Sequence, residues 1–339
     1  MTKKIIYTFI ALLSCFYVNA EESLSIIYIH IGDSLPKHLM ESIRQIRLHN
    51  SNENIYLCGN AEALNKVQRQ LKDLSVKEIP VETLPQSEQH QKFLRKTSFT
   101  EPFWIRTTER LLFVHELIRK EKLENAFHIE SDVMVYSSFR AMLPIFIKNY
   151  PSIAIPFAND QAAICSVIFI KNEKAASLMS DCIANHASEG ENDMRLPGIL
   201  KEEMGMSVID HLPILPRFYV DKVEQSQFIN KLSNTIEDKF AYSKYFEDFS
   251  CIFDAVTFGL LLSKEQICEG TIFDPRVFNL IWKKDNHNLY VPYVQYNGFE
   301  CRICNLHIHG KNLKDFRSDM KAPPPSWINK SVVRGSGRY

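Results

Sequence analysis

The chain has 339 residues, of which 45% are hydrophobic and 11% aromatic, so it can bury a sizeable core in one large α/β domain or two ordinary ones. Lys and Arg together number 40, as do Asp and Glu, which gives a formal net charge of zero. Proteins that bind nucleic acid through bulk electrostatics carry a basic excess, so this balance argues against that class and leaves only local basic patches open.

The first twenty residues have the pattern of an export signal. Two lysines precede an apolar run, Ile5 to Val18, and a small residue, Ala20, stands before the first acidic residues. Two other interpretations stay open: Leu12–Cys15 resembles a bacterial lipobox that would leave Cys15 as a lipidated N-terminus, or the run stays uncleaved as an anchor. It is shorter than the roughly 20 residues of a membrane span. We expect residues 1–20 to direct the chain to export or to a membrane.

Short apolar runs alternate with helical patterns after the signal, which favours a parallel, doubly wound sheet. No G-x-G-x-x-G follows the first run, and no G-x-x-x-x-G-K-[ST] occurs, so a dinucleotide Rossmann site and a P-loop are both disfavoured. The predicted strands are 24–31, 55–58 and 76–79, and the predicted helices are 36–48 and 61–74.

A polar, aperiodic stretch, 80–100, is predicted to be a loop crossing the top of the sheet. The longest helical pattern follows at 103–122. Arg106 and Arg110 lie four residues apart on one face of it. Two interpretations stay open for them: solvated helix charges, or contacts to a nucleotide or sugar if this helix packs beside the acidic turn described next.

The central acidic turn is Glu130-Ser131-Asp132. It follows Phe127–Ile129, an apolar run typical of a buried parallel strand, whose carboxyl end is where such sheets carry functional groups. Two carboxylates this close raise each other's pKa unless a cation lies between them, so the pair indicates a divalent metal. Oxygen ligands suit Mg²⁺ or Mn²⁺ shared with substrate phosphates. The alternative is a solvated loop.

The second half of the chain is predicted to be one domain with the first, because no flexible linker divides residues 21–321. Two interpretations stay open for the acidic cluster 189–194: a solvated loop, or a helix start at which Asp193 is the N-terminal carboxylate. Three prolines make 322–339 an irregular tail. The predicted strands are 153–156, 164–170 and 282–296, and the predicted helices are 173–186, 228–245 and 251–262.

Eight cysteines are present, and the seven beyond the signal are odd in number and irregular in spacing, which is not a disulfide framework. Cys301 and Cys304 form a lone C-x-x-C close to two histidines, but four zinc ligands within nine residues lack the usual loop between halves. We predict a simple cysteine pair, free or disulfide-bonded. Cys58 and Cys165 lie in apolar runs and are predicted to be buried free thiols.

The stretch from Asn305 to Leu313 is the second group of residues with chemical potential. Alternation along a strand places His307 and His309 on one face, and Gly310-Lys311 follows. Imidazole binds metals, glycine lets a backbone come close, and lysine offers a compact charge to a phosphate. The alternative is two hydrogen-bonded histidines on a half-buried strand.

Together, Glu130-Ser131-Asp132 and the C-terminal histidine–lysine stretch resemble the GT-A glycosyltransferases, nucleotide-sugar enzymes whose Asp-x-Asp motif ends a central strand. Here Glu130 replaces the first Asp, and the resemblance spans roughly 25–316. It implies an α/β fold with a doubly wound, mostly parallel central sheet, helices on both faces and an elaborated C-terminal half.

The resemblance also implies a site. Asp132 and His309 are the implied metal ligands, with His307 as the alternative ligand and Lys311 as a diphosphate contact. Glu130 is left as either a metal ligand or a ribose contact, while Arg106 and Arg110 are further candidate donor contacts. The strand 163–170 would lie under the acceptor, and Asp193 resembles the acidic residue that faces it, which makes it the candidate base if the reaction inverts.

We therefore expect a metal-dependent glycosyltransferase that uses Mn²⁺ or Mg²⁺ and a nucleotide-diphosphate sugar, with a glycan, lipid or protein acceptor. A sugar-phosphate nucleotidylyltransferase would need a Gly-rich, basic loop after the first strand, which residues 31–34 do not provide. An exported carbohydrate-binding or surface protein is the other rival, because a bacterial periplasm is not expected to hold nucleotide sugars. A secretory-pathway lumen or an anchor facing the cytosol would remove that conflict.

Overall fold

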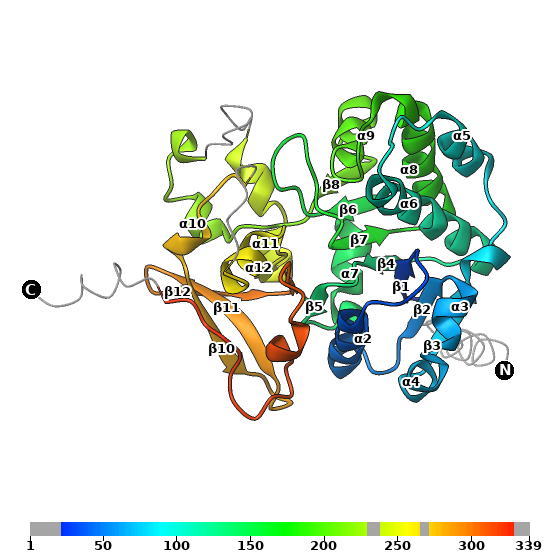
Figure 1. Cartoon of the computed structure of the whole chain (residues 1–339). Coiled ribbons are helices and arrows are strands. Elements are labelled where there is room, and N and C mark those ends of the chain that lie inside the picture. The colour runs from blue at the N-terminus through cyan, green and yellow to red at the C-terminus, as the bar shows by residue number, and fades with distance from the viewer. Residues whose placement is uncertain (1–21, 229–237, 265–270, 329–339) are drawn as a thin grey trace, which may run out of the picture.

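The computed structural model describes residues 22–228, 238–264 and 271–328. A seven-stranded sheet with helices on both faces forms its larger part, and a smaller sheet lies beside it (Figure 1). Neighbouring strands are parallel except at the fifth strand across, which runs antiparallel to both of its neighbours. The predicted α/β class with a mostly parallel sheet is confirmed. Across the sheet the strands are β3 (Val76–Pro80), β2 (Asn54–Gly59), β1 (Ser25–His30), β4 (Ala126–Ile129), β7 (Val167–Ile170), β6 (Ile153–Ile155) and β8 (Ile209–His211).

The large sheet is buried on both faces, because successive side chains of each strand enter two different apolar clusters. In β1, Ile26 and Tyr28 belong to one cluster, and Ile27 and Ile29 to the other. This explains why the strands are continuous apolar runs in the sequence. Residues of α2 (Lys37–His49), α3 (Ala61–Asn65), α4 (Gln68–Asp73) and α7 (Phe139–Asn149) join the first cluster, and residues of α5 (Glu88–Lys96), α6 (Pro102–Glu121), α8 (Glu173–His186) and α9 (Leu196–Met204) join the second.

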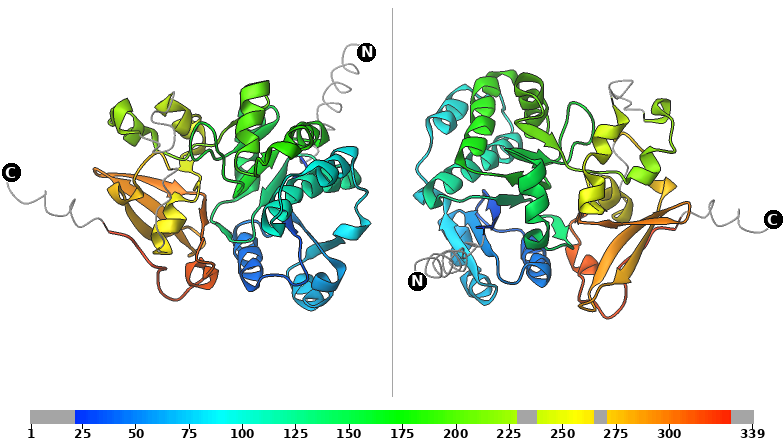
Figure 2. Two further views of the ribbon diagram at one scale, coloured as in Figure 1. Left: turned by 45° about the horizontal axis from the view of Figure 1, so that its top comes forward. Right: turned by 180° about the vertical axis from the view of Figure 1, so that it is seen from behind.

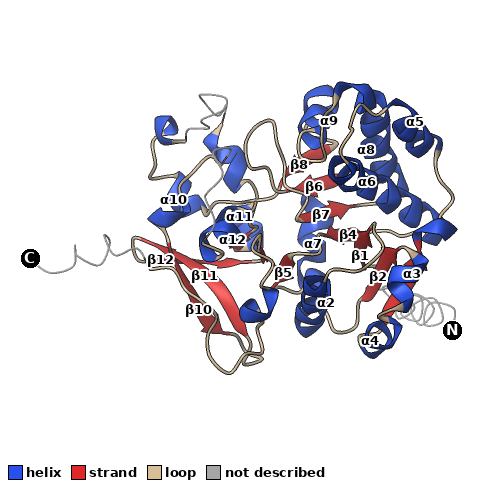
Figure 3. Ribbon diagram, in the orientation of Figure 1, coloured by secondary structure: helices blue, strands red, loops and turns tan. Residues whose placement is uncertain are grey.

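The C-terminal half adds two more sheets (Figure 3). One has four strands, and the other pairs β5, from the middle of the chain, with β13, from near its end. Figure 2 shows the two halves from further sides, with the large sheet and its helices in one and the orange strands in the other. The strands are β9 (Cys251–Ile252), β10 (Asn279–Lys284), β11 (Tyr290–Tyr296) and β12 (Phe299–Ile303), with β5 (Val133–Val135) and β13 (Asn305–His307); the helices are α10 (Arg217–Val220), α11 (Phe246–Phe249) and α12 (Thr257–Leu262). The described residues also contain six short 3₁₀ helices: η1 (Val81–Thr83), η2 (Ala187–Glu189), η3 (Gln225–Gln227), η4 (Lys239–Ser243), η5 (Pro275–Val277) and η6 (Leu313–Phe316).

Two predictions in the first third were wrong. The helix expected at 61–74 is two helices, because the β-branched Val67 leaves the helical region with φ −124°. The loop expected at 80–100 contains α5, whose N-terminus is capped by the Ser87 side chain accepting from the His90 amide. Only His90 and Phe93 of α5 are buried, so the helix has almost no apolar periodicity to read.

A buried polar network holds α5 against α6. The His90 ring is fully buried, with Nδ1 2.9 Å from Glu116 Oε1 and Nε2 3.0 Å from Glu109 Oε1. Burial alone would lower the pKa of His90, but hydrogen bonds to Glu109 and Glu116 raise it to about 9. The imidazolium is therefore the form that stabilises this helix pair.

Three predictions in the second half were also wrong. The strand expected at 282–296 is two antiparallel strands, β10 and β11, joined by a turn over 285–289. The apolar run 251–262 is not one helix: Cys251–Ile252 is a strand, and an irregular stretch, 253–256, separates it from α12. The carboxylate of Asp254 accepts the amides of Phe258 and Gly259, each at 2.9 Å, and so starts the helix late. Of the helix expected at 228–245, the described part contains the 3₁₀ helix η4 instead.

Other expectations fall partly outside the described residues. The predicted export signal, residues 1–20, lies outside them and stays a prediction, and so does the end of the tail, 329–339. Within 322–328 the tail lies along β10, since Trp327 and Leu280 exchange two backbone hydrogen bonds. Cys301 and Cys304 are buried free thiols, as are Cys58 and Cys165. Within the described ranges, we find no helix with both the length and the apolar character needed to cross a membrane.

We predict a pH-dependent stability that depends on His90. The folded pKa of about 9 exceeds the usual 6.5, so the stabilisation is complete below pH 6.5 and is lost as the pH rises through 9. The free energy of unfolding should therefore fall between these values, with His90 contributing on the order of 2–3 kcal/mol. In His90→Gln the fall should be smaller by that amount, as measured by urea unfolding at several pH values. Equal slopes in the two proteins would contradict a charged His90.

Candidate active site

The predicted acidic turn connects β4 to β5. β4 ends at Ile129, β5 begins at Val133, and the Val133 amide donates to the Glu130 carbonyl at 3.2 Å, which closes the turn between them. The Glu130 amide donates to the carbonyl of Ser166, the residue before β7, also at 3.2 Å. Glu130 and Asp132 therefore stand at the carboxyl end of a central strand, as predicted, and their side chains are only 12% and 13% exposed.

His307 reaches this turn because β13 pairs antiparallel with β5. His307 lies opposite Val133, and the next amide, that of Ile308, donates to the Asp132 carbonyl at 2.9 Å. His307 Nε2 lies 3.2 Å from Asp132 Oδ1 and 3.8 Å from Glu130 Oε2. In Figure 1 the label β5 marks this junction between the two halves of the molecule.

Glu130, Asp132 and His307 have a donor set that fits a divalent metal. One ligand atom from each lies within 4.8 Å of the other two. Carboxylate oxygens with one imidazole nitrogen suit Mn²⁺ or Mg²⁺ better than a thiophilic metal. In the protein alone, His307 and Asp132 form an ion pair: although both are buried, Asp132 and Glu130 raise the pKa of His307 to about 9, and His307 holds the pKa of Asp132 well below its usual range.

Arg110 joins the acidic turn to the loop before α9. One nitrogen, Nη2, lies 2.6 Å from Glu130 Oε1 and 3.1 Å from Asp193 Oδ2. Burial would lower the pKa of Arg110, but the two carboxylates raise it. Burial raises the pKa of Asp193 by more than Arg110 lowers it. A single guanidinium therefore pairs with two carboxylates on different elements, and the three groups together keep one negative charge when both carboxylates are ionised.

Asp193 is not the residue that caps α9. The side chain of Asn192 accepts the amides of Met194 and Arg195 at 3.1 and 3.0 Å, and α9 begins at Leu196. The expectation that Asp193 opens this helix was wrong, because the turn held by Asn192 comes first and α9 begins only at Leu196, where the N-cap residue Arg195 makes no side-chain cap. Asp193 is 6% exposed and directs its carboxylate to Arg110 instead.

β13 ends at His307, so His307 and His309 do not share a strand face as predicted. His309 is exposed, its ring centre lies 6.0 Å from that of His307, and it is absent from the metal-binding group found among the described residues. Its role as a ligand stays a prediction. Of the two histidines, the structure brings His307 to the carboxylates.

Cationic side chains gather at the end of β1, beside the acidic turn. Arg106 is exposed, and a side chain added at Gly32 would meet its Nη1 at 4.0 Å. Lys311 is exposed too, and its charge contributes to lowering the pKa of both Asp132 and His30. Burial is the main cause that lowers the pKa of His30, with Arg106, Arg110 and Lys311 adding to it. The predicted cations and carboxylates thus meet at one end of the large sheet.

Three residues of this region were missed from the sequence. His30 ends β1, and its Nε2 lies 3.0 Å from the Ser34 carbonyl. His38, in the first turn of α2, has its Nε2 3.2 Å from Ser131 Oγ. Asp254 is buried beneath His307. The rule that placed Glu130 at a strand end applies equally to His30, and an acidic residue inside the apolar run 251–262 was the available signal for Asp254.

Asp254 positions His307 from behind. Its Oδ2 accepts hydrogen bonds from the amides of His307 at 3.1 Å and of Gly259 at 2.9 Å. Burial raises the pKa of this carboxyl to about 6, although these hydrogen bonds act to lower it. Gly259 permits the close packing of α12 on β13, since a Cβ there would lie 1.7 Å from the His307 carbonyl oxygen. The site is therefore built on a backbone contact that tolerates only glycine.

Comparison with known proteins gives structural similarity alone. No protein-family model matches the sequence, and no curated protein matches it significantly. The chain is similar to the structure of mouse xyloside xylosyltransferase 1 without ligand (10% identity over 59% of this chain and 90% of that one, TM-score 0.43). It is also similar to galactosyltransferase LgtC with donor and acceptor sugar analogues (9%, 59% and 78%, TM-score 0.37) and to a cytidylyltransferase from Leptospira borgpetersenii (10%, 57% and 76%, TM-score 0.36).

Glycosyltransferases thus recur among the similar structures, in line with the resemblance seen in the sequence. Identities of this size and TM-scores below 0.5 do not transfer an activity to this chain. Its function has to be inferred from the side chains of the site.

We predict that Gly259→Ala disables this site. The new methyl group would collide with the His307 backbone, so α12 or β13 must move, at a cost of about 1–3 kcal/mol for such overpacking. Thermal unfolding should show a lower Tm, and Mn²⁺ titration should show weaker binding. Gly59→Ala is the control, because a Cβ there would meet its nearest neighbours, the His30 carbonyl oxygen and the Leu64 side chain, at 3.4 Å, an ordinary contact. Unchanged stability of Gly259→Ala would contradict the packing argument.

Proposed function

We propose that this protein is a metal-dependent glycosyltransferase that takes a sugar from a nucleotide-diphosphate donor. The observation that carries the proposal is the junction of Glu130, Asp132 and His307, assembled from two distant stretches beside exposed cations. A nucleoside diphosphate carries the negative charge that such a metal and such cations would bind. The metal would be Mn²⁺ or Mg²⁺, and it would supply a Lewis acid for the charge that develops on the leaving diphosphate.

Each residue of the site has a role in this proposal. Asp132 and His307 hold the metal, with Glu130 as a third ligand or as the residue that orients Asp132. Lys311 and Arg106 are exposed near the acidic turn, where they can contact the diphosphate. Arg110 fixes the Glu130 carboxylate through the 2.6 Å contact. We propose His307 rather than His309 as the imidazole ligand, because His307 Nε2 lies 3.2 Å from Asp132 Oδ1 and shares a metal-binding group with both carboxylates.

Asp193 is the proposed acceptor-side acid–base residue. Its carboxylate stands on the loop before α9, across Arg110 from Glu130. If the reaction inverts the anomeric centre, Asp193 would accept the proton of the acceptor hydroxyl, and its raised pKa suits a base better than an ordinary aspartate does. If the reaction retains configuration, no such base is needed. The acceptor class, whether glycan, lipid or protein, stays open in this proposal.

The proposal predicts metal-dependent binding of a nucleoside diphosphate. Calorimetric titration of the purified protein with UDP and with GDP should give binding that requires Mn²⁺ or Mg²⁺. Asp132→Ala and His307→Ala should weaken it at least about tenfold, because each removes a metal ligand. His309→Ala is the matched control, two residues from His307, and should bind within a factor of two or three of the wild type.

Three results would contradict the proposal or part of it. Equal losses in His307→Ala and His309→Ala would remove the distinction between the histidines. No binding of either nucleotide, together with metal-independent binding of a glycan, would favour the exported carbohydrate-binding protein. Release of pyrophosphate from a nucleoside triphosphate and a sugar phosphate would identify a nucleotidylyltransferase instead.

A further inference from the structure

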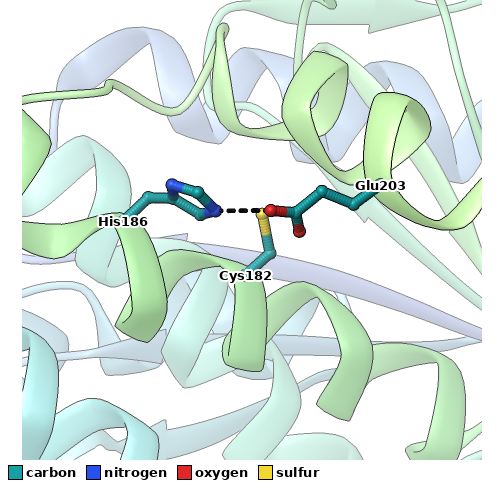
Figure 4. A group of neighbouring side chains, drawn as sticks. All are labelled: Cys182, His186 and Glu203. Atoms are coloured by element: carbon teal, nitrogen blue, oxygen red, sulfur yellow. Dashed lines mark hydrogen bonds and ion pairs between the residues drawn. The ribbon is translucent and has the colours of Figure 1, made fainter.

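A second group of metal-binding side chains lies away from the acidic turn, between α8 and α9. Cys182 and His186 stand one helical turn apart on α8, and Glu203 reaches them from the end of α9 (Figure 4). One ligand atom from each residue lies within 4.8 Å of the other two. Residues four apart on a helix face the same side, so the sequence spacing itself directs the thiol and the imidazole to one point.

The His186 ring is held between two carboxylates. Its Nδ1 lies 2.7 Å from Glu189 Oε2 on η2, and its Nε2 lies 2.9 Å from Glu203 Oε1. An Nδ1–H donated to Glu189 fixes the ring and leaves Nε2 facing Glu203 and Cys182. Histidines that bind metals characteristically donate their other N–H to a carboxylate in this way. The ring is therefore already oriented for an ion at Nε2.

Cys182 supplies the ligand that the acidic turn lacks. Its side chain is buried, and its thiol donates a long hydrogen bond of 3.6 Å to the Leu196 carbonyl. A contact this weak leaves the thiol available, and the sulfur lies within 4.8 Å of the Glu203 and His186 ligand atoms. An ion pair of His186 with Glu189 and Glu203 would need no sulfur atom beside it, and neither would the packing of α8 on α9. The position of Cys182 therefore favours a metal site.

We propose that Cys182, His186 and Glu203 form a zinc site, with Glu189 orienting His186 and a fourth position open to water. Thiolate and imidazole ligands select Zn²⁺, whereas the carboxylate-rich acidic turn suits Mn²⁺ or Mg²⁺. In a tetrahedral site with these bond lengths, ligand atoms lie about 3.5 Å apart, so the present 2.9 Å between His186 Nε2 and Glu203 Oε1 would widen, which the half-exposed Glu203 side chain permits.

Binding at this site exchanges protons for the ion. The Cys182 S–H and the Nε2–H of the His186 imidazolium are lost, and bonds from Zn²⁺ to sulfur and nitrogen replace them, so two protons leave for each ion bound. Thiolate and carboxylate together then neutralise the two positive charges of the ion.

The ion would tie together both ends of one segment. Residues 187–204 run from η2 to the end of α9 and include Asp193, which pairs with Arg110 at the acidic turn. Metal bonds to Cys182 and His186 on α8 and to Glu203 on α9 would therefore restrict the movement of the loop that carries Asp193. None of these ligands belongs to the acidic turn. This inference stands independently of the proposed glycosyl transfer.

Cobalt substitution tests the site, because a Co²⁺–thiolate bond gives a near-ultraviolet charge-transfer band. The metal-free full-length protein should bind one equivalent of Co²⁺ with that band, and added Zn²⁺ should remove it. The acidic turn offers no thiolate, so Co²⁺ bound there gives no such band, and Asp132→Ala should leave the signal intact. No band in the wild type would overturn the proposal.

Matched variants assign the ligands. Cys182→Ala should abolish the band and Cys58→Ala, another buried thiol, should retain it; a band that survives Cys182→Ala would overturn the proposal. Glu203→Gln should weaken Co²⁺ binding at least about tenfold, while Glu202→Gln, its neighbour paired with Arg195, should not. Because Glu203 is on the surface, this pair decides the matter even if Cys182→Ala does not fold, and equal affinities would overturn the proposal.

Discussion

The pairing of β5 with β13 is the contact on which the candidate active site depends. It has only three residues on each strand, yet it joins the large sheet to the C-terminal half and carries His307 to the acidic turn. Closing a loop between the middle and the end of the chain has an entropic cost, which grows only slowly with loop length. Full burial of Met134 and Leu306, which lie opposite each other in this pairing, offsets part of that cost.

The same short pairing is supported from its far side by polar groups. Asp254 receives amides from both α12 and β13, so a single carboxylate satisfies the start of a helix and the end of a strand. Buried backbone amides need such partners, because an unpaired one loses its hydrogen bond to water without compensation. The chemistry of the site therefore rests on a buried acid that need not touch any ligand.

The sequence predicts this fold best where apolar pattern and burial coincide. Strands of the large sheet are apolar throughout because both faces are covered, and the helix over 173–186 appears with the predicted bounds. The placing of Glu130 and Asp132 followed from one rule, that parallel sheets expose their carboxyl ends. A rule of this kind needs no knowledge of distant contacts, so it works from local sequence.

What escaped prediction depends on contacts between distant residues. His307 and His309 alternate equally well in sequence, and they differ only because β5 is long enough to pair with one and not the other. The helix at Glu88–Lys96 was missed because its inner face is held by a charged histidine and two glutamates, not by a row of apolar residues. Asp254 falls inside the helix predicted at 251–262, whereas its carboxylate accepts amides from the first turn of a helix that begins at Thr257.

The placement of Arg110 between Glu130 and Asp193 has a thermodynamic consequence. One nitrogen serves both carboxylates, so the electrostatic states of the acidic turn and of the loop before α9 are linked. Any event that draws the Glu130 carboxylate away leaves the guanidinium to Asp193 alone, and a proton taken up by Asp193 strengthens the hold on Glu130. This linkage is reciprocal. The free energy by which a change at Glu130 alters proton binding at Asp193 equals the free energy by which that proton alters the change at Glu130. Glu130 and Asp193 thus compete for the single positive charge of Arg110.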